Sequence, residues 1–469
     1  IAGTVGSAAA IPTELHHATE NQVDPTWNAF VRLSTKTETT GEGEEAVTTE
    51  AEDAQKIYIG QLFGGGNGDY DYTSEDSPYK GKDKPVMART YLEICGGSIV
   101  YAYGGGNNAT ITENTVICLN NPSRVVNSIK DTRITTAGEG ELLTATRFRE
   151  KMGINTGLSY PSSDAFQIGR LFGGNNKAEM KIRPMWYLKA GQVRNLYSGG
   201  NQGSMTNPEG LLLEIMANST IKVDNVYGGC RMADVRPQRN GVDLLTNDIQ
   251  LHDSENHQIY NFPAGLSARV LVRGGDINNV YGGNDITGRV YGGNAVGVYH
   301  SIRGNVYGGG NGSYPYTDNA DLIGNDVYGD LYYTIPTGKT SVQALNDFRP
   351  NAEQVSIRVA GKPNLNEAGD TVSFTKTIIH GSIYCGGNSA TLKKSDRVEK
   401  PLVELKMGSH VIADNVFLGN NGVNMVSEDI LKILANEEVD NFTQMHLTDA
   451  ATFAKYMDGA AMNMVPSVT

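Results

Sequence analysis

The sequence predicts an all-β fold, a right-handed parallel β-helix (β-solenoid) with inserted loops and a short helical segment near its C-terminus. Three observations support this prediction. A short phrase recurs ten times along the 469 residues, and glycine, 56 residues in all, is frequent in that phrase. Alternating β-branched and polar residues surround it, as in residues 219–223 and 356–359. Recurrence at a regular interval is typical of repeat architectures, and alternation with a period of two is typical of strands.

The recurring phrase joins an aliphatic residue, an aromatic residue and a corner of small residues and asparagine. Residues 280–284 (Val-Tyr-Gly-Gly-Asn) and 306–311 (Val-Tyr-Gly-Gly-Gly-Asn) are examples. The aromatic positions are Phe63, Tyr103, Phe172, Tyr197, Tyr227, Tyr281, Tyr291, Tyr307, Tyr384 and Phe417. The corner asparagines expected to act alike are Asn67, Asn107, Asn175, Asn201, Asn284, Asn294, Asn311 and Asn388.

The spacing of the phrase predicts the size of one coil. Successive copies, such as those at Phe172, Tyr197 and Tyr227, recur at intervals of about 25 to 30 residues, which lies within the range of known repeat units. We expect one such interval to form one coil. Tyr281 and Tyr291 are too close together in the sequence to belong to successive coils. Their short spacing indicates a second corner of the same coil.

Stacking the coils gives each position of the phrase a role. The aliphatic residue is expected to face inward, and the aromatic residue after it to face the other way, in a ladder of rings on an outer face or just under a covering loop. Two consecutive glycines would allow positive φ at the corner, and asparagine would form a hydrogen-bonded ladder there. Parallel crossovers are nearly always right-handed, which sets the expected hand. A second ladder is expected from Asn195, Asn225, Asn279, Asn305 and Asn415.

Three regions are expected along the chain: an N-terminal cap over 1–56, the repeats over 57–426, and a helical segment over 427–469 that either caps the solenoid or is an insertion. Segments 69–88, 120–165 and 234–265 are expected to be loops. Residues 37–53 carry seven acids and no base, which predicts a solvated, mobile loop and makes Ca²⁺ the one cofactor considered. The first residue is not Met, so a longer protein is expected.

Composition narrows the classes of partner. The net charge of −13 and pI of about 5.2 argue against nucleic acid, which requires a basic surface. The sequence contains no apolar run of about 18 residues, so no membrane span is predicted. The widely spaced Cys95, Cys118, Cys230 and Cys385 are expected to be small buried or half-buried residues, with a disulfide between stacked coils as the alternative.

The motifs of known catalytic sites do not match. Pectin hydrolases of the β-helix class use paired aspartates with a histidine motif, but His380-Gly381 lacks nearby paired aspartates. Asp276, Asp285, Asp318, Asp321, Asp326 and Asp330 have no spacing typical of a lyase site. The adjacent His16 and His17 would point to opposite faces of a strand. No catalytic or metal-ligating residue is therefore assigned.

The Asn-Val-Tyr-Gly-Gly-Asn and Val-Tyr-Gly-Gly-Gly-Asn phrases resemble those of large secreted or cell-surface Bacteroidota proteins with glycine-rich β-helical repeats. The resemblance covers roughly 57–426. It implies an elongated, modular, extracellular or cell-surface protein that reaches the outside through a secretion system.

The leading functional hypothesis is a non-enzymatic, adhesin-like surface or fibre component whose partners are other copies of itself or surface proteins. The second is a β-helix that binds or cleaves carbohydrate, since an exposed aromatic row suits sugar rings. A phage tail fibre or spike is the third.

Overall fold

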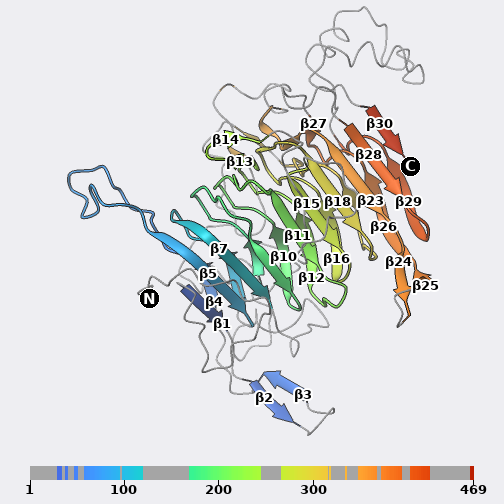
Figure 1. The fold of residues 1–469 in the computed structure, drawn as a ribbon, viewed down its shortest axis with the longest axis horizontal. Helices are drawn as coiled ribbons and strands as arrows, with labels where there is room; N and C mark the ends of the chain where they lie inside the picture. Colours follow the sequence, from blue (N-terminus) through green and yellow to red (C-terminus); the bar gives the residue numbers. More distant parts are fainter. Residues whose placement is uncertain are drawn as a thin grey trace, which may run out of the picture.

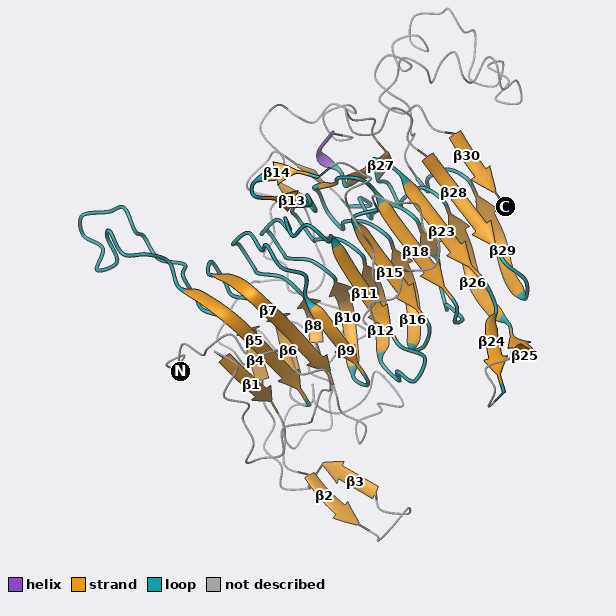
Figure 2. Cartoon of the chain, in the orientation of Figure 1, coloured by secondary structure: helices purple, strands orange, loops and turns teal. Residues whose placement is uncertain are grey.

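The computed structural model describes residues 29–33, 37–40, 47–50, 58–95, 98–119, 168–244, 266–314, 316–317, 333–334, 338, 347–366, 371–392, 402–422 and 465–468. The all-β prediction is confirmed for these residues. Helix is confined there to Asp347 and Phe348, and most strands pair in parallel (Figures 1 and 2). No helix within these ranges has the length and hydropathy needed to cross a membrane.

The largest sheet has nine strands, all paired in parallel, and its order reverses the order of the chain. Each strand contains an aliphatic–aromatic pair of the phrase or ends on one. The strands are β29 (Val411–Phe417), β26 (Thr377–Tyr384), β19 (Val306–Tyr307), β16 (Asp276–Tyr281), β12 (Lys222–Tyr227), β10 (Gln192–Tyr197), β8 (Ile168–Phe172), β6 (Ser98–Tyr103) and β4 (Tyr58–Phe63).

Two further parallel sheets alternate with it along the chain. The four-stranded sheet holds β1 (Ala29–Leu33), β5 (Val86–Ile94), β7 (Thr110–Leu119) and β9 (Met185–Leu188). The six-stranded sheet holds β11 (Leu211–Ile215), β15 (Ala268–Val272), β18 (Asn294–Val298), β23 (Val355–Val359), β28 (Leu402–Met407) and β30 (Val465–Val468). Because β9 and β11 are neighbours, these two sheets follow one another along the molecule.

A third, shorter ladder follows the corners. It comprises β17 (Arg289–Val290), β22 (Asn351–Ala352) and β27 (Thr391–Leu392), and isolated parallel bridges continue it through Val235 and Met205 to Met180. Each repeat therefore adds one strand to the four- or six-stranded sheet and one to the nine-stranded sheet, and from β8 to β26 each repeat also adds one short contact to this ladder. The sheets remain open, with free edge strands.

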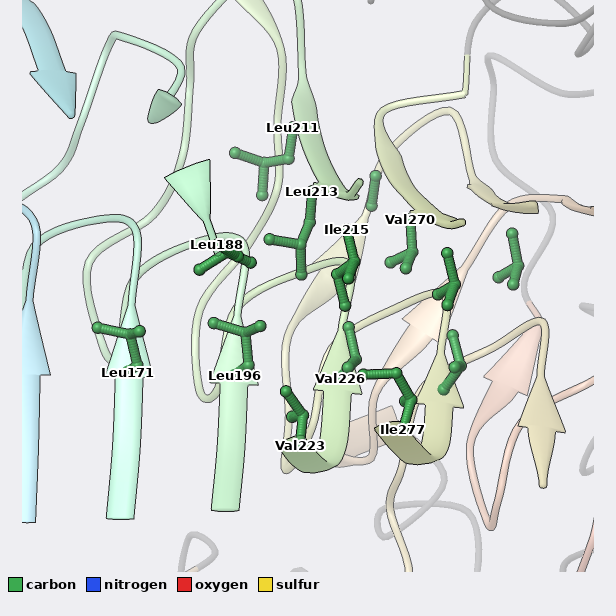
Figure 3. Close-up of a cluster of buried hydrophobic side chains, with 14 of the residues drawn as sticks. Leu171, Leu188, Leu196, Leu211, Leu213, Ile215, Val223, Val226, Val270 and Ile277 are labelled. Carbon is green, nitrogen blue, oxygen red and sulfur yellow. The ribbon is translucent and has the colours of Figure 1, made fainter. Parts of the chain in front are cut away.

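Aliphatic side chains fill the space between the sheets. In Figure 3, Leu171, Leu196 and Val226 from the nine-stranded sheet lie opposite Leu213 and Ile215 of β11, in one cluster. All five are fully buried. Burial of one such side chain contributes about 1.5–3 kcal/mol, so the repeated aliphatic position is a major source of stability.

The remaining strands form short hairpins and one parallel pair. They are β2 (Thr37–Thr40) with β3 (Val47–Glu50), β13 (Gln238–Arg239) with β14 (Val242–Asp243), β24 (Lys362–Leu365) with β25 (Thr371–Thr375), and the parallel pair β20 (Tyr316–Thr317) and β21 (Tyr333–Thr334).

The β2–β3 hairpin corrects the prediction of a loop over the acidic run 37–53. The Thr37–Thr40 segment pairs antiparallel with Val47–Glu50. Threonine and valine favour strands, and this preference prevails over the charge of the intervening glutamates. Segment 234–265 also includes a hairpin, β13–β14, where only a loop was expected.

At the C-terminal end, the helices expected within 427–469 fall outside the described residues. The described part of that segment is β30, which pairs in parallel with β28. The six-stranded sheet thus extends one strand beyond the last complete repeat. Segment 120–165 and residues 245–265 also fall outside the described residues.

Candidate functional site: the stacked aromatic and asparagine columns

Nine aromatic rings form one continuous stack on the nine-stranded sheet, here called the aromatic column. Consecutive ring centroids are 4.6–5.0 Å apart and their planes differ by 2–12°. Parallel strands about 4.8 Å apart impose this spacing when equivalent residues are in register. The members are Phe63, Tyr103, Phe172, Tyr197, Tyr227, Tyr281, Tyr307, Tyr384 and Phe417.

Tyr291, the tenth sequence-predicted position, lies outside the aromatic column. It follows β17 in the short ladder, and its ring packs against the guanidinium groups of Arg236 and Arg289, at 5.1 and 4.8 Å from the centroid. This location agrees with the second corner inferred from its short spacing after Tyr281.

The aromatic column is buried along most of its length. Tyr103, Phe172, Tyr197, Tyr227, Tyr281 and Tyr307 are all at most 5% exposed. Over this stretch the rings are therefore not exposed for stacking against sugars. Of the two expected positions, on an outer face or just under a covering loop, the outer face is wrong. Phe417, at the end of the stack, is 45% exposed.

A second column runs through the fourth residue after each aromatic, here called the corner column. Each asparagine Nδ2 donates to the Oδ1 of the asparagine one repeat earlier, at 2.8 Å for Asn107 to Asn67 and 3.0 Å for Asn421 to Asn388. The ladder repeats the same bond in every all-asparagine step. Its members are Asn67, Asn107, Asn176, Asn201, Arg231, Asp285, Asn311, Asn388 and Asn421.

The two columns are joined by hydrogen bonds that reach two repeats forward. The Tyr197 hydroxyl donates to Asp285 Oδ2 at 2.7 Å, and Asn311 Nδ2 donates to the Tyr227 hydroxyl at 3.2 Å. Tyr103 contacts Asn201 with the same offset, at 3.5 Å. The same offset pairs Tyr281 with Asn388 and Tyr307 with Asn421. The hydroxyl thus has a regular partner, which stacking alone does not require.

Two charged residues replace asparagine in the middle of the corner column. Arg231 Nη1 donates to Asn201 Oδ1 at 3.1 Å, and Asp285 comes one repeat later. Arg231 follows Phe172 by two repeats, and phenylalanine has no hydroxyl to bond. Asp285 accepts from Tyr197, from Asn311 at 3.0 Å and from Tyr314 at 2.5 Å. Both residues are buried, so the substitutions preserve hydrogen bonding in the interior.

Three of the sequence-predicted corner asparagines have other roles. Asn175 and Asn284 lie one position earlier than the corner column. Asn175 Oδ1 accepts from Gly106 N at 2.8 Å, and Asn284 Oδ1 accepts from Cys230 N at 2.8 Å. Asn294 lies in β18 and donates to the Gly308 carbonyl at 3.1 Å. Counting from the aromatic residue rather than from the glycines would have separated these two kinds of asparagine.

Positive φ, the expected role of the corner glycines, is found after Tyr291, at Gly292 and Gly293, but is wrong for the corners of the aromatic column. Among the described residues, none of the glycines directly after a column aromatic has positive φ. The space between repeats excludes a side chain instead. A Cβ on Gly105 would lie 1.9 Å from Asn175 Oδ1, and a Cβ on Gly229 would lie 2.0 Å from Asn284 Oδ1. Glycine is therefore needed so that the asparagine of the next repeat can reach the backbone.

The second asparagine ladder lies two residues before each aromatic. Asn225 donates to Asn195 at 2.9 Å and Asn279 donates to Asn225 at 3.0 Å. From there the bonds change form: the Asn279 oxygen accepts from Asn305 N, and the Asn305 oxygen accepts from Ser382 N. Asn415 Nδ2 lies 3.5 Å from Ser382 Oγ. Side-chain ladders thus flank the aromatic column on both sides.

Burial controls the ionisation of the column tyrosines. Desolvation raises the pKa of Tyr103, Tyr197, Tyr227, Tyr281 and Tyr307 above the ordinary value of 10.0, and the Asp285 carboxylate adds to the effect for Tyr197 and Tyr227. A tyrosinate nucleophile or base is accordingly disfavoured in the column.

The acids, histidines and cysteines form no metal-binding group in the described part of the chain. No group of three or more His, Cys, Asp or Glu residues there could hold a metal ion. Asp276 pairs with Arg303 at 2.5 Å, and Asp318, Asp321, Asp326 and Asp330 fall outside the described residues. The four cysteines are free thiols, and burial raises the pKa of Cys118, Cys230 and Cys385 to about 12.

Comparison with known proteins identifies no relative: no family model, no curated protein and no solved structure matches the chain.

Proposed function

We propose that this chain is a right-handed parallel β-helix that acts as a non-enzymatic, adhesin-like structural component at the cell surface or in an extracellular fibre. The three stacks of parallel strands are the faces of the solenoid, and the nearly universal right-handedness of parallel crossovers sets its hand. The resemblance of its glycine-rich phrases to Bacteroidota surface proteins supports the location.

The observation that carries this proposal is the continuous stack of nine aromatic rings across nine parallel strands. The ring stack and the asparagine ladders beside it direct the recurring side chains of each repeat toward its neighbours. Such columns stiffen a scaffold along one axis, because each repeat is bonded to the repeats beside it and the tyrosine hydroxyls also bond two repeats ahead. A catalytic site, by contrast, needs polar groups that converge on a substrate.

Two measurements test the proposal together. Small-angle X-ray scattering of the whole chain is expected to give the profile of an elongated particle. Incubation with a panel of acidic and neutral polysaccharides is expected to give no new reducing or unsaturated ends. A globular scattering profile would contradict the scaffold, and turnover of any polysaccharide would contradict the non-enzymatic role.

A second candidate, carbohydrate binding, is favoured by the loop between β4 and β5, which extends away from the sheets in Figure 1. The rings of Tyr70 and Tyr79 stack at 4.0 Å, with Tyr72 edge-on to Tyr70 at 6.5 Å. Tyr70 is 41% exposed. Asp71 stabilises the loop by accepting from the Thr73 and Ser74 amides, and these bonds lower its pKa. An exposed aromatic platform beside polar groups suits a sugar ring.

A glycan array tests this second candidate. If the loop binds sugars, Tyr70→Ala should abolish the signal that the unaltered chain gives. Phe374→Ala serves as the matched control, because Phe374 is also 41% exposed but lies on the β24–β25 hairpin. Equal loss of signal in both variants, or no signal from the unaltered chain, would remove the candidate.

A further inference from the structure

Consecutive rings in the middle of the aromatic column are all tyrosines, here called the tyrosine run. Phe172 precedes the run and Phe417 follows it. Within it, neighbouring ring centroids are 4.7–5.0 Å apart and the ring planes differ by 2–9°, so the phenol π-systems are in continuous contact. A phenol loses one electron far more readily than the ring of phenylalanine does. The members are Tyr197, Tyr227, Tyr281, Tyr307 and Tyr384.

One end of the tyrosine run lies against a carboxylate. The Tyr197 hydroxyl donates to Asp285 Oδ2 at 2.7 Å, which is the short length of a bond to a charged acceptor. Two further donors bond to Asp285 Oδ1. The hydroxyls of the next three tyrosines instead pair with asparagine amides of the corner column. A carboxylate can take a proton and an amide cannot, so Tyr197 is placed to release its hydroxyl proton.

The charges around Tyr197 favour a neutral radical over a radical cation. The guanidinium groups of Arg170 and Arg231 act electrostatically on Tyr197, and all three side chains are buried. Positive charge nearby raises the energy of a ring cation, most strongly where water is excluded. Loss of an electron from Tyr197 is therefore favoured when the hydroxyl proton leaves with it, and Asp285 is the acceptor in contact.

The other end of the tyrosine run is closer to solvent. Tyr384 is half-buried, whereas Tyr307 is 4% exposed and Tyr197 is fully buried. A diffusible oxidant therefore reaches Tyr384 more easily than the interior rings. Electron transfer slows steeply with distance, so short steps between stacked rings are faster than one step along the whole run.

We propose that the tyrosine run is a one-electron relay, which is oxidised at Tyr384 by a diffusible one-electron oxidant and holds the oxidising equivalent at Tyr197 as a neutral tyrosyl radical. The oxidant gains one electron, and the electron vacancy passes from ring to ring. At Tyr197 the phenolic O–H bond breaks and its proton forms an O–H bond with Asp285 Oδ2. The carboxylate becomes a neutral acid, and later reduction of the radical returns the proton. This activity goes beyond the scaffold role.

Flash oxidation of the whole chain tests the relay. The oxidant is tris(bipyridine)ruthenium(III), formed by a light flash with a cobalt(III) ammine as electron acceptor, and electron paramagnetic resonance detects the radicals. The unaltered chain is expected to give a long-lived neutral tyrosyl signal that Tyr197→Phe abolishes. Asp285→Asn should shorten the lifetime of that signal at least about tenfold, because the new amide cannot take the proton.

A matched pair of variants tests transfer along the stack. Tyr281→Phe keeps a ring in the middle of the run but removes its phenol, so the yield of the long-lived signal should fall at least about tenfold. Tyr103→Phe is the control and should leave the yield unchanged. Tyr103 is also a buried column tyrosine beside a corner asparagine, but Phe172 separates it from the run.

Four results would overturn the inference. They are the absence of a long-lived signal in the unaltered chain, its survival in Tyr197→Phe, its loss in Tyr314→Phe alone, and equal yields in Tyr281→Phe and Tyr103→Phe. Loss in Tyr314→Phe alone would place the radical on a phenol outside the stack. If Asp285→Asn loses the circular dichroism of the fold, the conservative Tyr197→Phe and Tyr281→Phe variants decide. The scattering profile and the polysaccharide assay do not depend on these results, so the scaffold proposal fails separately.

Discussion

Gly105 shows how one missing side chain connects two repeats. The Asn175 amide occupies the place where a Cβ on Gly105 would lie, and its oxygen accepts from the Gly106 amide. The next repeat therefore caps the corner of the preceding one. Glycine is required here by close approach of the neighbouring repeat, and backbone torsion makes no special demand.

Gly105→Ala is expected to lower the free energy of unfolding by about 1–3 kcal/mol, the usual cost of forcing extra volume into a packed site. Urea unfolding followed by circular dichroism measures the change. Gly66→Ala is the matched control in another corner, since its Cβ would lie 3.2 Å from Pro85 Cβ and 3.4 Å from Ala109 Cβ. Similar losses in both variants would argue against the role assigned to Asn175.

The column tyrosines predict a loss of stability in alkaline solution. Burial raises the pKa values of Tyr103, Tyr197 and Tyr227, so the folded chain retains protons that the unfolded chain releases above pH 10.0. The unfolded state then binds fewer protons, and stability falls as pH rises past that value. Urea midpoints at pH 8, 10 and 11 should decrease in that order. Tyrosinate absorbance from Tyr103, Tyr197 and Tyr227 near pH 10 without loss of structure would contradict the prediction.

At the scale of the strand, the tyrosine hydroxyl of the phrase adds hydrogen bonds to the stacking of the rings. The stack itself tolerates phenylalanine at Phe63, Phe172 and Phe417. Where tyrosine is present, the hydroxyl reaches across two strands to the corner column. The bonds differ in strength along the sheet, because the partner is an amide in some repeats and the Asp285 carboxylate in one.

Tyr197→Phe is expected to destabilise the chain by about 1.5–3 kcal/mol, the range for hydrogen bonds to charged groups, because buried Asp285 loses a donor. Tyr103→Phe keeps the same stacking and should cost less than about 1 kcal/mol, since its contact with Asn201 is at the 3.5 Å limit. Thermal and urea unfolding of the two variants provide the comparison. A larger loss for Tyr103→Phe would reverse the assignment.

At the scale of the whole molecule, the parallel register makes stability local. Each strand of the nine-stranded sheet pairs only with its neighbours, so a defect has few routes to distant repeats. This locality fits the proposed scaffold, which grows along one axis.

Hydrogen exchange in the Gly105→Ala variant tests this locality. Amides in β4, β6 and β8 are expected to exchange faster, because these strands flank the altered corner. Amides in β26 and at the end of β16 should keep the rates of the unaltered chain. A uniform increase in every strand would show that the chain unfolds as a single cooperative unit.

The all-β class and the position of most column residues could be predicted from the phrase itself. Nine of its ten aromatics stack, because the alternation of aliphatic and aromatic residues assigns each to one face of a strand. Tyr291 could be separated from them by its spacing alone.

Counting from the aromatic residue separates the two asparagine positions, but only the tertiary structure decided what each of them bonds to and why glycine precedes it. Asn175 and Asn176 are adjacent and chemically identical, yet one caps a corner and the other joins the ladder. Burial of the rings likewise depends on what surrounds the sheet, which local patterning does not encode. The sequence by itself determined strand, face and period, because these follow from the chemistry of adjacent residues. Distances between repeats determined the rest, because those contacts join residues 25 to 77 positions apart.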